Sequence, residues 1–412
     1  MNTDLIREID ALIEASREEL AADTIKLVNI KSVKSAPVPN APFGEGVKQV
    51  LDFMLEAGRN AGFDTKDYQM GVVSLALKEG TPDLGIWTHG DVVPEGDGWK
   101  FDPYHAVEYN GCIIGRGATD NKGQLAAMFH LFKILQRLNI ELKYNPAIYV
   151  GSNEESGMED VKSFLKSFQP PRLSLVPDSG FPVGYGGRGS AKITIRSKAP
   201  ILTAIPVSDG NMVSKICSEL LERNREEECD RTILEFVKTI SQDTSGTLFD
   251  LNVYSETMKR SLSITSKKIN TDDNGCVELL LDIRYPIEVI YQTIVDRIEH
   301  VCQENRFVIS HAENWSSPYL LDPNTELIRR LTQLANDVTG DMAAPYALGG
   351  ATYAHILPNA LVYGTDGNLP PEDFSKDRGH AHGIDEAVSL DRLQRAMKIY
   401  ARALLELNDM EW

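Results

Sequence analysis

The sequence predicts an α/β fold: a mixed, mostly parallel sheet with helices on both faces, and an inserted α+β lid domain. Three observations predict it. Short apolar runs alternate with amphipathic stretches over both ends of the chain. Polar residues with metal-binding or acid–base chemistry follow several of these runs directly. In the middle of the chain the pattern changes to strands in which apolar and polar residues alternate, as in a sheet with one wet face.

The outer parts of the chain carry the alternating pattern. Apolar residues recur with helical spacing over 4–27 and 46–61, and a last helix is expected over 389–407, with Ser389 as its N-cap. A further helix is expected over 121–138. Apolar runs predict buried strands at 72–77, 84–88, 147–151, 173–176 and 360–363.

The middle of the chain predicts a separate domain. Strands are expected at 191–197, 248–254, 261–268 and 276–283, with helical stretches at 211–240 and 287–303. The glycine-rich run 184–189 is suited to a hinge at its entrance. We therefore expect residues 1–186 and 318–412 to form the catalytic domain, and residues 187–317 to form an inserted lid that binds substrate and could mediate dimerisation.

Composition excludes several classes of protein. The chain has 412 residues, 42% of them hydrophobic, and a formal net charge of −18, without the basic stripe that nucleic-acid binding needs. Five widely spaced cysteines without a Cys-x-x-Cys pair suit reduced thiols in a cytosol. The charged N-terminus does not resemble a signal peptide, and no apolar run is long enough to span a membrane. A cytoplasmic protein is expected.

Five islands of polar residues supply two imidazoles and five carboxylates, the ligand types of a dinuclear metal site. Four of the islands end or closely follow short apolar runs typical of buried strands, and open α/β sheets place their sites at the ends of such strands. Nitrogen and oxygen donors without thiolate suit zinc, or else cobalt or manganese, and two such ions could polarise one shared water. The islands are His89 with Asp91, Asp120, Glu154 with Glu155, Asp178, and His382.

Each island alone also has an ordinary structural interpretation. His89 and Asp91 could form a surface turn, Asp120 could be a simple N-cap, and Glu154-Glu155 could be an exposed acidic turn. If functional, Asp91 would stand behind the imidazole of His89. Neighbouring side chains point opposite ways, so one glutamate could bind metal while the other acts as general base. From composition alone, His380 and His382 are alternatives.

With these islands in this order, the sequence resembles the dinuclear zinc peptidase and amidohydrolase family that includes acetylornithine deacetylase, succinyl-diaminopimelate desuccinylase, carnosinase and dipeptidase V. Thr88-His-Gly-Asp-Val-Val-Pro94 is similar to its first signature, and Gly115-Arg-Gly-Ala-Thr-Asp-Asn-Lys-Gly123 to its second. Leu348-Gly-Gly-Ala-Thr-Tyr-Ala354 and Ile283-Arg-Tyr-Pro286 are closest to the dipeptidase V branch.

The resemblance implies a role for each island. Asp120 would bridge two zinc ions, His89 and Asp178 would complete one metal, and Glu155 and His382 the other. Glu386 lies four residues after His382, as the family pattern requires, which selects His382 over His380. Glu154 would be the general base, and Asp91 the carboxylate behind the histidine.

The resemblance also implies a lid that binds the carboxylate of the substrate. Arg284 and, more weakly, Asn211 match lid residues, and the turn containing Gly349, Gly350 and Thr352 would contact the substrate backbone. One departure is clear: the family's lid histidine is missing, because no histidine occurs between Asp178 and His300. Arg188 and Lys192 are candidate substitutes for this oxyanion donor.

The function expected from the resemblance is hydrolysis of dipeptides or short peptides by a water activated by two zinc ions. The first alternative is an N-acyl amino acid deacylase or desuccinylase that uses the same metals. The second, suggested by the missing lid histidine, is a metal-binding homologue with weak or no catalysis. The expected partner is a small peptide or N-acyl amino acid, and the expected assembly is a monomer or a homodimer.

Overall fold

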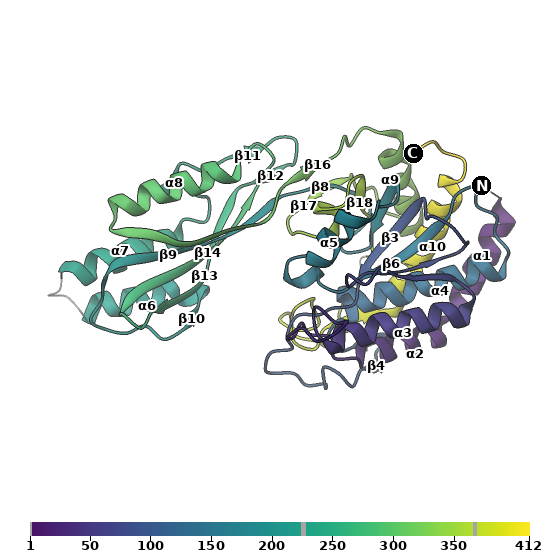
Figure 1. Cartoon of the computed structure of the whole chain (residues 1–412), viewed down its shortest axis with the longest axis horizontal. Helices are drawn as coiled ribbons and strands as arrows, with labels where there is room; N and C mark the ends of the chain where they lie inside the picture. The colour runs from purple at the N-terminus through teal and green to yellow at the C-terminus, as the bar shows by residue number, and fades with distance from the viewer. Residues whose placement is uncertain (1, 224–227, 366–368) are drawn as a thin grey trace. The chain divides into compact units, whose positions relative to one another are not determined.

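The computed structural model of the chain describes residues 2–223, 228–365 and 369–412 (Figure 1). The chain divides into two compact units. Unit 1 comprises Met1–Tyr185, Asp322–Tyr346 and Thr352–Trp412, and unit 2 comprises Gly186–Leu321 and Ala347–Ala351. The assignment of catalysis to one domain and of substrate binding to the other remains a prediction.

Unit 1 is built on a mixed sheet with a parallel centre, which confirms the predicted fold class. The strands β6, β3, β7 and β18 are parallel neighbours, and the pairs outside them are antiparallel. In sheet order the strands are β1 (Asp64–Asp67), β2 (Val73–Ala76), β6 (Pro146–Gly151), β3 (Leu84–His89), β7 (Leu173–Val176), β18 (Ala360–Val362) and β8 (Gly184–Gly187). The chain passes from unit 1 into unit 2 within β8.

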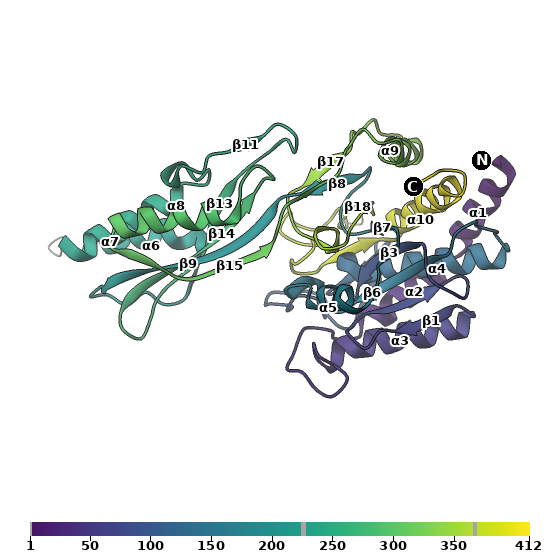
Figure 2. The ribbon, with the colours of Figure 1, turned by 45° about the horizontal axis from the view of Figure 1, so that its top comes forward.

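Helices cover both faces of this sheet (Figures 1 and 2). Leu75 and Trp87 lie on opposite faces, because their register partners on β6 are consecutive residues. Gly58 of α3 lies directly against Leu75, whereas Phe164 of α5 packs against Trp87 with 5.4 Å between ring centroids. The helices of unit 1 are α1 (Thr3–Ala15), α2 (Arg17–Val28), α3 (Glu45–Ala61), α4 (Gly123–Arg137), α5 (Glu159–Ser167), α9 (Glu326–Thr339) and α10 (Leu390–Leu407).

Some predicted elements need correction in detail. The single helix expected over 4–27 is two helices that meet at Ser16. The helix expected from residue 121 begins at Gly123, because an irregular turn, η1 (Ala118–Lys122), precedes it with Asp120 at φ −142°. The N-cap prediction for α10 is confirmed, since the Ser389 side chain accepts the amide of Arg392.

Unit 2 is an antiparallel sheet with helices on one face (Figure 2). Ile193 and Ile195 of β9 and Ile283 of β14 belong to one core with apolar residues of α6, α7 and α8. The sheet order is β10 (Ser208–Asp209), β13 (Ser263–Thr271), β14 (Cys276–Tyr285), β9 (Gly189–Pro200) and β15 (Phe307–Ser316). The helices are α6 (Val213–Arg223), α7 (Glu228–Gln242) and α8 (Tyr291–Glu304). Part of the helical stretch predicted over 211–240, residues 224–227, lies outside the described residues.

One predicted strand of unit 2 is wrong. Residues 248 and 249 belong to a short turn of helix, η4 (Thr247–Phe249), residues 251–253 have no regular structure, and only Tyr254 belongs to a strand, β11 (Tyr254–Ser255). The alternation was misleading because Phe249 and Leu251 reach the core from a turn with left-handed residues at its ends. Among the described residues, no helix is both long and apolar enough to cross a membrane.

Candidate metal centre

The five sequence-predicted ligands, together with the predicted general base Glu154, lie in unit 1 as two adjacent groups. In each group one ligand atom per residue lies within 4.8 Å of the others. The first group is His89, Glu154 and Asp178, and the second is Asp120, Glu155 and His382. Each group therefore offers one imidazole and two carboxylates.

The parallel strands explain why these residues meet. His89 is the last residue of β3, the turn η2 (Glu154–Ser156) follows β6, and Asp178 follows β7. Because β6, β3 and β7 are parallel neighbours, their carboxyl ends meet at one edge of the sheet. Asp120 enters from the irregular turn η1, and His382 enters from a loop with a left-handed backbone at φ 62°.

Asp120 lies between the two groups. Its Oδ1 is 3.0 Å from Nε2 of His89, and its Oδ2 is 3.1 Å from Nε2 of His382. The same nitrogen of His382 lies 3.0 Å from Oε1 of Glu155. One carboxylate thus presents one oxygen to each group, which is the arrangement expected of a bridging ligand.

The Asp91 carboxylate binds the backbone of the two glutamates, in addition to lying near the imidazole of His89. It accepts the backbone amides of Glu154 and Glu155, both at 3.1 Å. Its main-chain oxygen is 3.0 Å from Nδ1 of His89, closer than its carboxylate oxygen at 3.5 Å. The side chain of Asp91 is only 1% exposed, so these bonds are shielded from water.

A second buried carboxylate, Glu386, organises the turn that carries Asp120. One of its oxygens accepts the amides of Thr119 and Asp120 at 2.9 and 3.0 Å. The other accepts the amide of Gly117 at 3.0 Å and a guanidinium N–H of Arg116 at 2.5 Å. Arg116 also donates to the main-chain oxygen of His382 at 3.4 Å. Glu386 and Arg116 therefore connect the turn that carries Asp120 to the loop that carries His382.

Burial and mutual repulsion dominate the electrostatics of the site. Burial raises the pKa of Glu154 well above its usual range, and the charge of Asp178 adds to the effect. Burial, followed by repulsion from Asp120, raises the pKa of both Glu155 and Asp178 to about 7. Hydrogen bonding to Asp120 raises the pKa of His382 to about 10. Such a cluster of acids is stabilised when cations are present.

The donor set fits divalent metal ions. Oε1 of Glu154 is buried and has no hydrogen-bond partner among the described residues. An orphaned buried carboxylate oxygen is costly unless a cation or another ligand meets it. The donors within reach are imidazole nitrogens and carboxylate oxygens, and no described cysteine belongs to either group. These are donors that zinc, cobalt or manganese accept.

Sequence reasoning missed several residues that position the ligands. It used Glu386 only to choose a histidine, and it did not assign Arg116 a role. Asn121 donates from Nδ2 to Oδ1 of Asp178 at 3.1 Å. Asp160 accepts the amides of Ser152 and Asn153, at 2.7 and 3.0 Å, directly before the glutamate pair. The adjacency of Asn121 to Asp120 was the available signal for the first of these contacts.

The predicted substrate-binding residues fall into both units. Thr352 lies in unit 1, where its side chain caps the short helix η5 (Tyr353–His355) by accepting the amide of Ala354. Gly349 and Gly350 lie in unit 2 together with Arg284 and Asn211. Arg284 lies on β14 beside Asp282, and Asn211 is exposed in the turn η3 (Gly210–Met212). The roles of these residues in substrate binding remain predictions.

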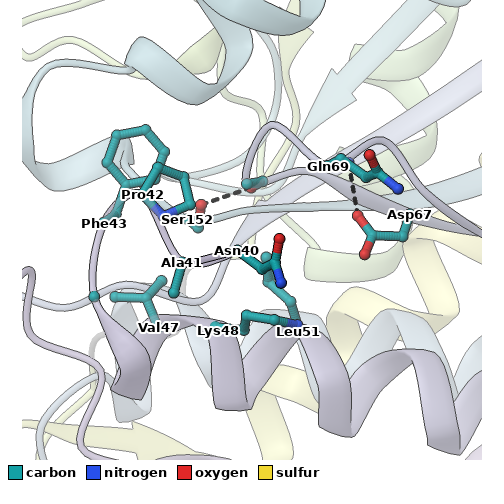
Figure 3. A pocket seen from close by; sticks show the side chains of 12 residues that line it. Asn40, Ala41, Pro42, Phe43, Val47, Lys48, Leu51, Asp67, Gln69 and Ser152 are labelled. Atoms are coloured by element: carbon teal, nitrogen blue, oxygen red, sulfur yellow. Dashed lines mark hydrogen bonds between the residues drawn. The ribbon is translucent and has the colours of Figure 1, made fainter. Parts of the chain in front are cut away.

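A cavity of about 320 Å³ lies at the N-terminus of α3 and is distinct from the two ligand groups (Figure 3). Phe43, Val47 and Asp67 contribute to its lining, and none of the metal-ligand candidates does. Ser152 reaches this cavity, but its hydroxyl donates to the main-chain oxygen of Gly71 at 2.6 Å. The cavity therefore carries no part of the candidate metal chemistry.

Two adjacent N/O ligand groups at the carboxyl edge of an α/β sheet define a metal-dependent hydrolase. The chain belongs to Peptidase family M20/M25/M40, whose sequence profile matches residues 85–406. This family is metal-dependent and hydrolyses peptide bonds, which confirms the predicted family and class of enzyme.

The chain is similar to named proteins over nearly its whole length. It is 26% identical to "Putative dipeptidase YtjP" of Bacillus subtilis (strain 168), covering 95% of this chain and 97% of that protein. Its fold is similar to that of human carnosine dipeptidase 1, with a TM-score of 0.71, 16% identity, and coverage of 98% and 99%. It is also similar to the di-peptidase Dug1p of Saccharomyces cerevisiae, with a TM-score of 0.69, 15% identity, and 99% of each chain covered.

Proposed function

We propose that this peptidase cleaves dipeptides or short peptides and uses two zinc ions, with cobalt or manganese as alternatives. The observation that carries the proposal is the position of Asp120, whose two oxygens point to different histidines. Names of similar proteins add support, since the bacterial relative is named a dipeptidase and the two solved structures are dipeptidases. A cytosolic location, and a monomer or homodimer, remain parts of the proposal.

The proposed ligands come from the two groups, with Glu154 of the first group kept as the general base. His89 and Asp178 would hold one ion, Glu155 and His382 would hold the other, and Asp120 would contribute to both. Bound divalent ions would supply Lewis acidity that polarises a water and the scissile carbonyl. The Asp91 carboxylate fixes the backbone of both glutamates, and so fixes where their side chains begin.

Glu154 is the proposed general base. Its Oε1 is buried and unpartnered among the described residues, and burial raises its pKa, so the carboxylate is a stronger proton acceptor than an exposed glutamate. It would take a proton from the attacking water at this oxygen. It would then return the proton to the nitrogen of the leaving amine, which balances the reaction.

The test is the Glu154→Gln variant, assayed on a dipeptide panel with metal content measured in parallel. We expect turnover to fall by about 10²–10⁴-fold, as loss of a general base does, with metal content unchanged. Glu159→Gln is the matched control, because Glu159 is an exposed acid that pairs with Lys162 on α5. Wild-type turnover by Glu154→Gln would refute the assignment.

No histidine occurs between Asp178 and His300 in the sequence, and the family's lid histidine is therefore missing. Two alternative functions stay open for this reason: an N-acyl amino acid deacylase or desuccinylase, and a metal-binding homologue with weak or no catalysis. A panel that pairs dipeptides with N-acyl amino acids separates a dipeptidase from a deacylase. A protein that binds two metal equivalents but cleaves neither class would be the metal-binding homologue.

A further inference from the structure

The turn that carries Glu154 and Glu155 is held by two buried carboxylates. Four consecutive backbone amides, those of residues 152–155, donate to them. The first two amides donate to one oxygen of Asp160, at 2.7 and 3.0 Å, and the last two donate to Asp91, both at 3.1 Å. Because four adjacent amides end on two side chains, the position of the turn depends on where these two carboxylates are fixed.

Asp160 is fixed in turn by the hydroxyl of Tyr353. This hydroxyl donates at 2.5 Å to Oδ2 of Asp160, the same oxygen that accepts the two amides. The other oxygen of Asp160 accepts the amide of Val161, in the first turn of α5, at 2.7 Å. Asp160 is 0% exposed and Tyr353 is 1% exposed, and both belong to unit 1. One buried hydrogen bond therefore connects the short helix η5 to the turn of the glutamates.

The close approach of Tyr353 requires a glycine at the end of β6. A Cβ atom on Gly151 would lie 1.9 Å from the hydroxyl oxygen of Tyr353 and 2.7 Å from Oδ2 of Asp160. Both distances are far shorter than van der Waals contact, so a larger residue would push the pair apart. The missing side chain of Gly151 therefore makes room for the hydrogen bond directly before the glutamate turn.

The ring of Tyr353 is also fixed by its neighbours on β3. Its centroid lies 6.2 Å from that of Trp87 and 6.4 Å from that of His89, with interplanar angles of 71° and 89°. Buried rings in such edge-to-face arrangements restrict one another. Tyr353 thus packs against a candidate metal ligand with its ring and holds Asp160 with its hydroxyl.

The charges of this pair favour the same arrangement. Burial raises the pKa of Asp160 to about 6, and the hydrogen bond from Tyr353 opposes this rise. Burial and the charge of Asp160 raise the pKa of Tyr353 well above its usual range, so the hydroxyl keeps its proton and remains a donor. Tyr353 therefore favours the ionised form of Asp160, and an ionised carboxylate accepts backbone amides more strongly than a neutral acid does.

We propose that Tyr353 is a positioning residue for the general base. The inference rests on the proposed function, in which Glu154 is that base. Without the hydroxyl, Asp160 would lose one of its fixed donors and would hold the amides of Ser152 and Asn153 less firmly. The backbone of Glu154 would then be free to shift, and a misplacement of about 1 Å at a reacting group can lower a rate by about 10²-fold.

The test is the Tyr353→Phe variant, assayed on a dipeptide at saturating zinc. Phenylalanine keeps the ring and removes only the hydroxyl. We expect kcat to fall about 10–100-fold while KM changes less than about twofold, because the base is displaced and substrate binding is not. Zinc content, measured on the same samples, should stay at the wild-type level, so that loss of metal does not account for the fall in kcat.

A second measurement needs no turnover. Amide hydrogen exchange reports how firmly the backbone of residues 152–155 is held. In Tyr353→Phe these amides should exchange about tenfold faster than in the wild type or more. If Tyr353 acts through Asp160, the effects of the two residues are coupled, so the double variant with Asp160→Asn should have no lower kcat than Asp160→Asn alone.

Tyr363→Phe is the matched control. Tyr363 is a tyrosine of unit 1 that is 0% exposed, and its hydroxyl donates to the main-chain oxygen of Leu331 at 2.9 Å. The same chemical change therefore removes one buried hydrogen bond outside the candidate metal centre. This variant should lose thermal stability, but it should keep the wild-type kcat and the wild-type exchange of residues 152–155.

The outcomes separate this inference from the proposed function. Wild-type kcat in Tyr353→Phe, or an equal loss of kcat in Tyr353→Phe and Tyr363→Phe, would overturn the inference and leave peptide hydrolysis intact. Faster exchange of the turn in Tyr353→Phe, with no hydrolysis of any dipeptide by the wild type, would support the hold of Tyr353 on the turn and contradict the proposed function.

Discussion

Replacing Asp91 by Asn tests how the site holds its two glutamates. The carboxylate accepts two backbone amides at 3.1 Å from a side chain that is 1% exposed. Asparagine keeps one acceptor oxygen, but its NH₂ group would face the second amide. A hydrogen bond to a charged acceptor contributes about 1.5–3 kcal/mol, and a buried donor left unpaired costs about 1–3 kcal/mol.

A further effect opposes this loss. Removing one negative charge relieves repulsion among the buried carboxylates. The charge of Asp91 also raises the pKa of the buried Asp160, so this repulsion reaches beyond the two ligand groups. We take the hydrogen-bond loss to be larger and expect the metal-free variant to be destabilised by about 2 kcal/mol. Because the amides belong to Glu154 and Glu155, metal affinity should also fall by about 10–100-fold.

The assay combines urea unfolding of the metal-free chain with titration of zinc against a competing chelator. Asp97→Asn is the matched control, because Asp97 is exposed in the same loop. It should behave as wild type in both measurements. If Asp91→Asn also binds zinc as wild type does, the two amide bonds do not position the ligands, and the reasoning is wrong.

Other predictions address the supports of the site and the stability of unit 1. Glu386→Gln breaks the buried pair with Arg116 and should cost about 3–5 kcal/mol in urea unfolding; a loss below 1 kcal/mol would contradict this. A hydrogen bond with His130 is the main cause that lowers the pKa of Asp23 from 3.8 to about 2. Asp23 therefore stabilises the fold above pH 4, and this contribution is lost as the pH falls towards 2. Urea unfolding should show wild type about 2 kcal/mol more stable than Asp23→Asn at pH 6 and by less at pH 3, whereas an equal difference at both would refute the pairing. Ser389→Ala should cost about 1 kcal/mol by removing the cap of α10, seen as a lower thermal midpoint; Ser389→Asn, which can still cap, should restore it. Removal of metal by a chelator should abolish peptide hydrolysis, and added zinc should restore it.

The sequence predicted the grouping of the ligands because their positions follow from a general property of parallel sheets. His89, Glu154 and Asp178 each end or follow an apolar run, and parallel neighbouring strands bring such ends together. The order of the strands could not be read from the runs. It depends on long-range pairing, such as that of β18 with β7, between segments far apart in the chain.

The supports of the site were harder to predict than its ligands. A ligand is recognisable by residue type, whereas a support depends on which backbone amides turn inward. Glu386 accepts three amides of the Gly117–Asp120 turn, and no spacing in the sequence indicates contacts across more than 260 residues. Residues 347–351 belong to unit 2, where the main-chain oxygens of Ala347 and Gly349 accept guanidinium groups of Arg260 and Arg188 and that of Leu348 accepts the amide of Arg188.

The distance along the chain between Asp120 and Glu386 has a consequence for biosynthesis. During translation the turn around Asp120 emerges long before the carboxylate that holds its amides, and His382 emerges almost as late. A ribosome-bound chain that ends before these residues has four of the five proposed metal ligands but lacks His382, and it also lacks the Glu386 carboxylate that holds the Asp120 turn. The second ligand group is therefore complete only once His382 and Glu386 have been synthesised, so a polypeptide that stops before them lacks a complete candidate metal site.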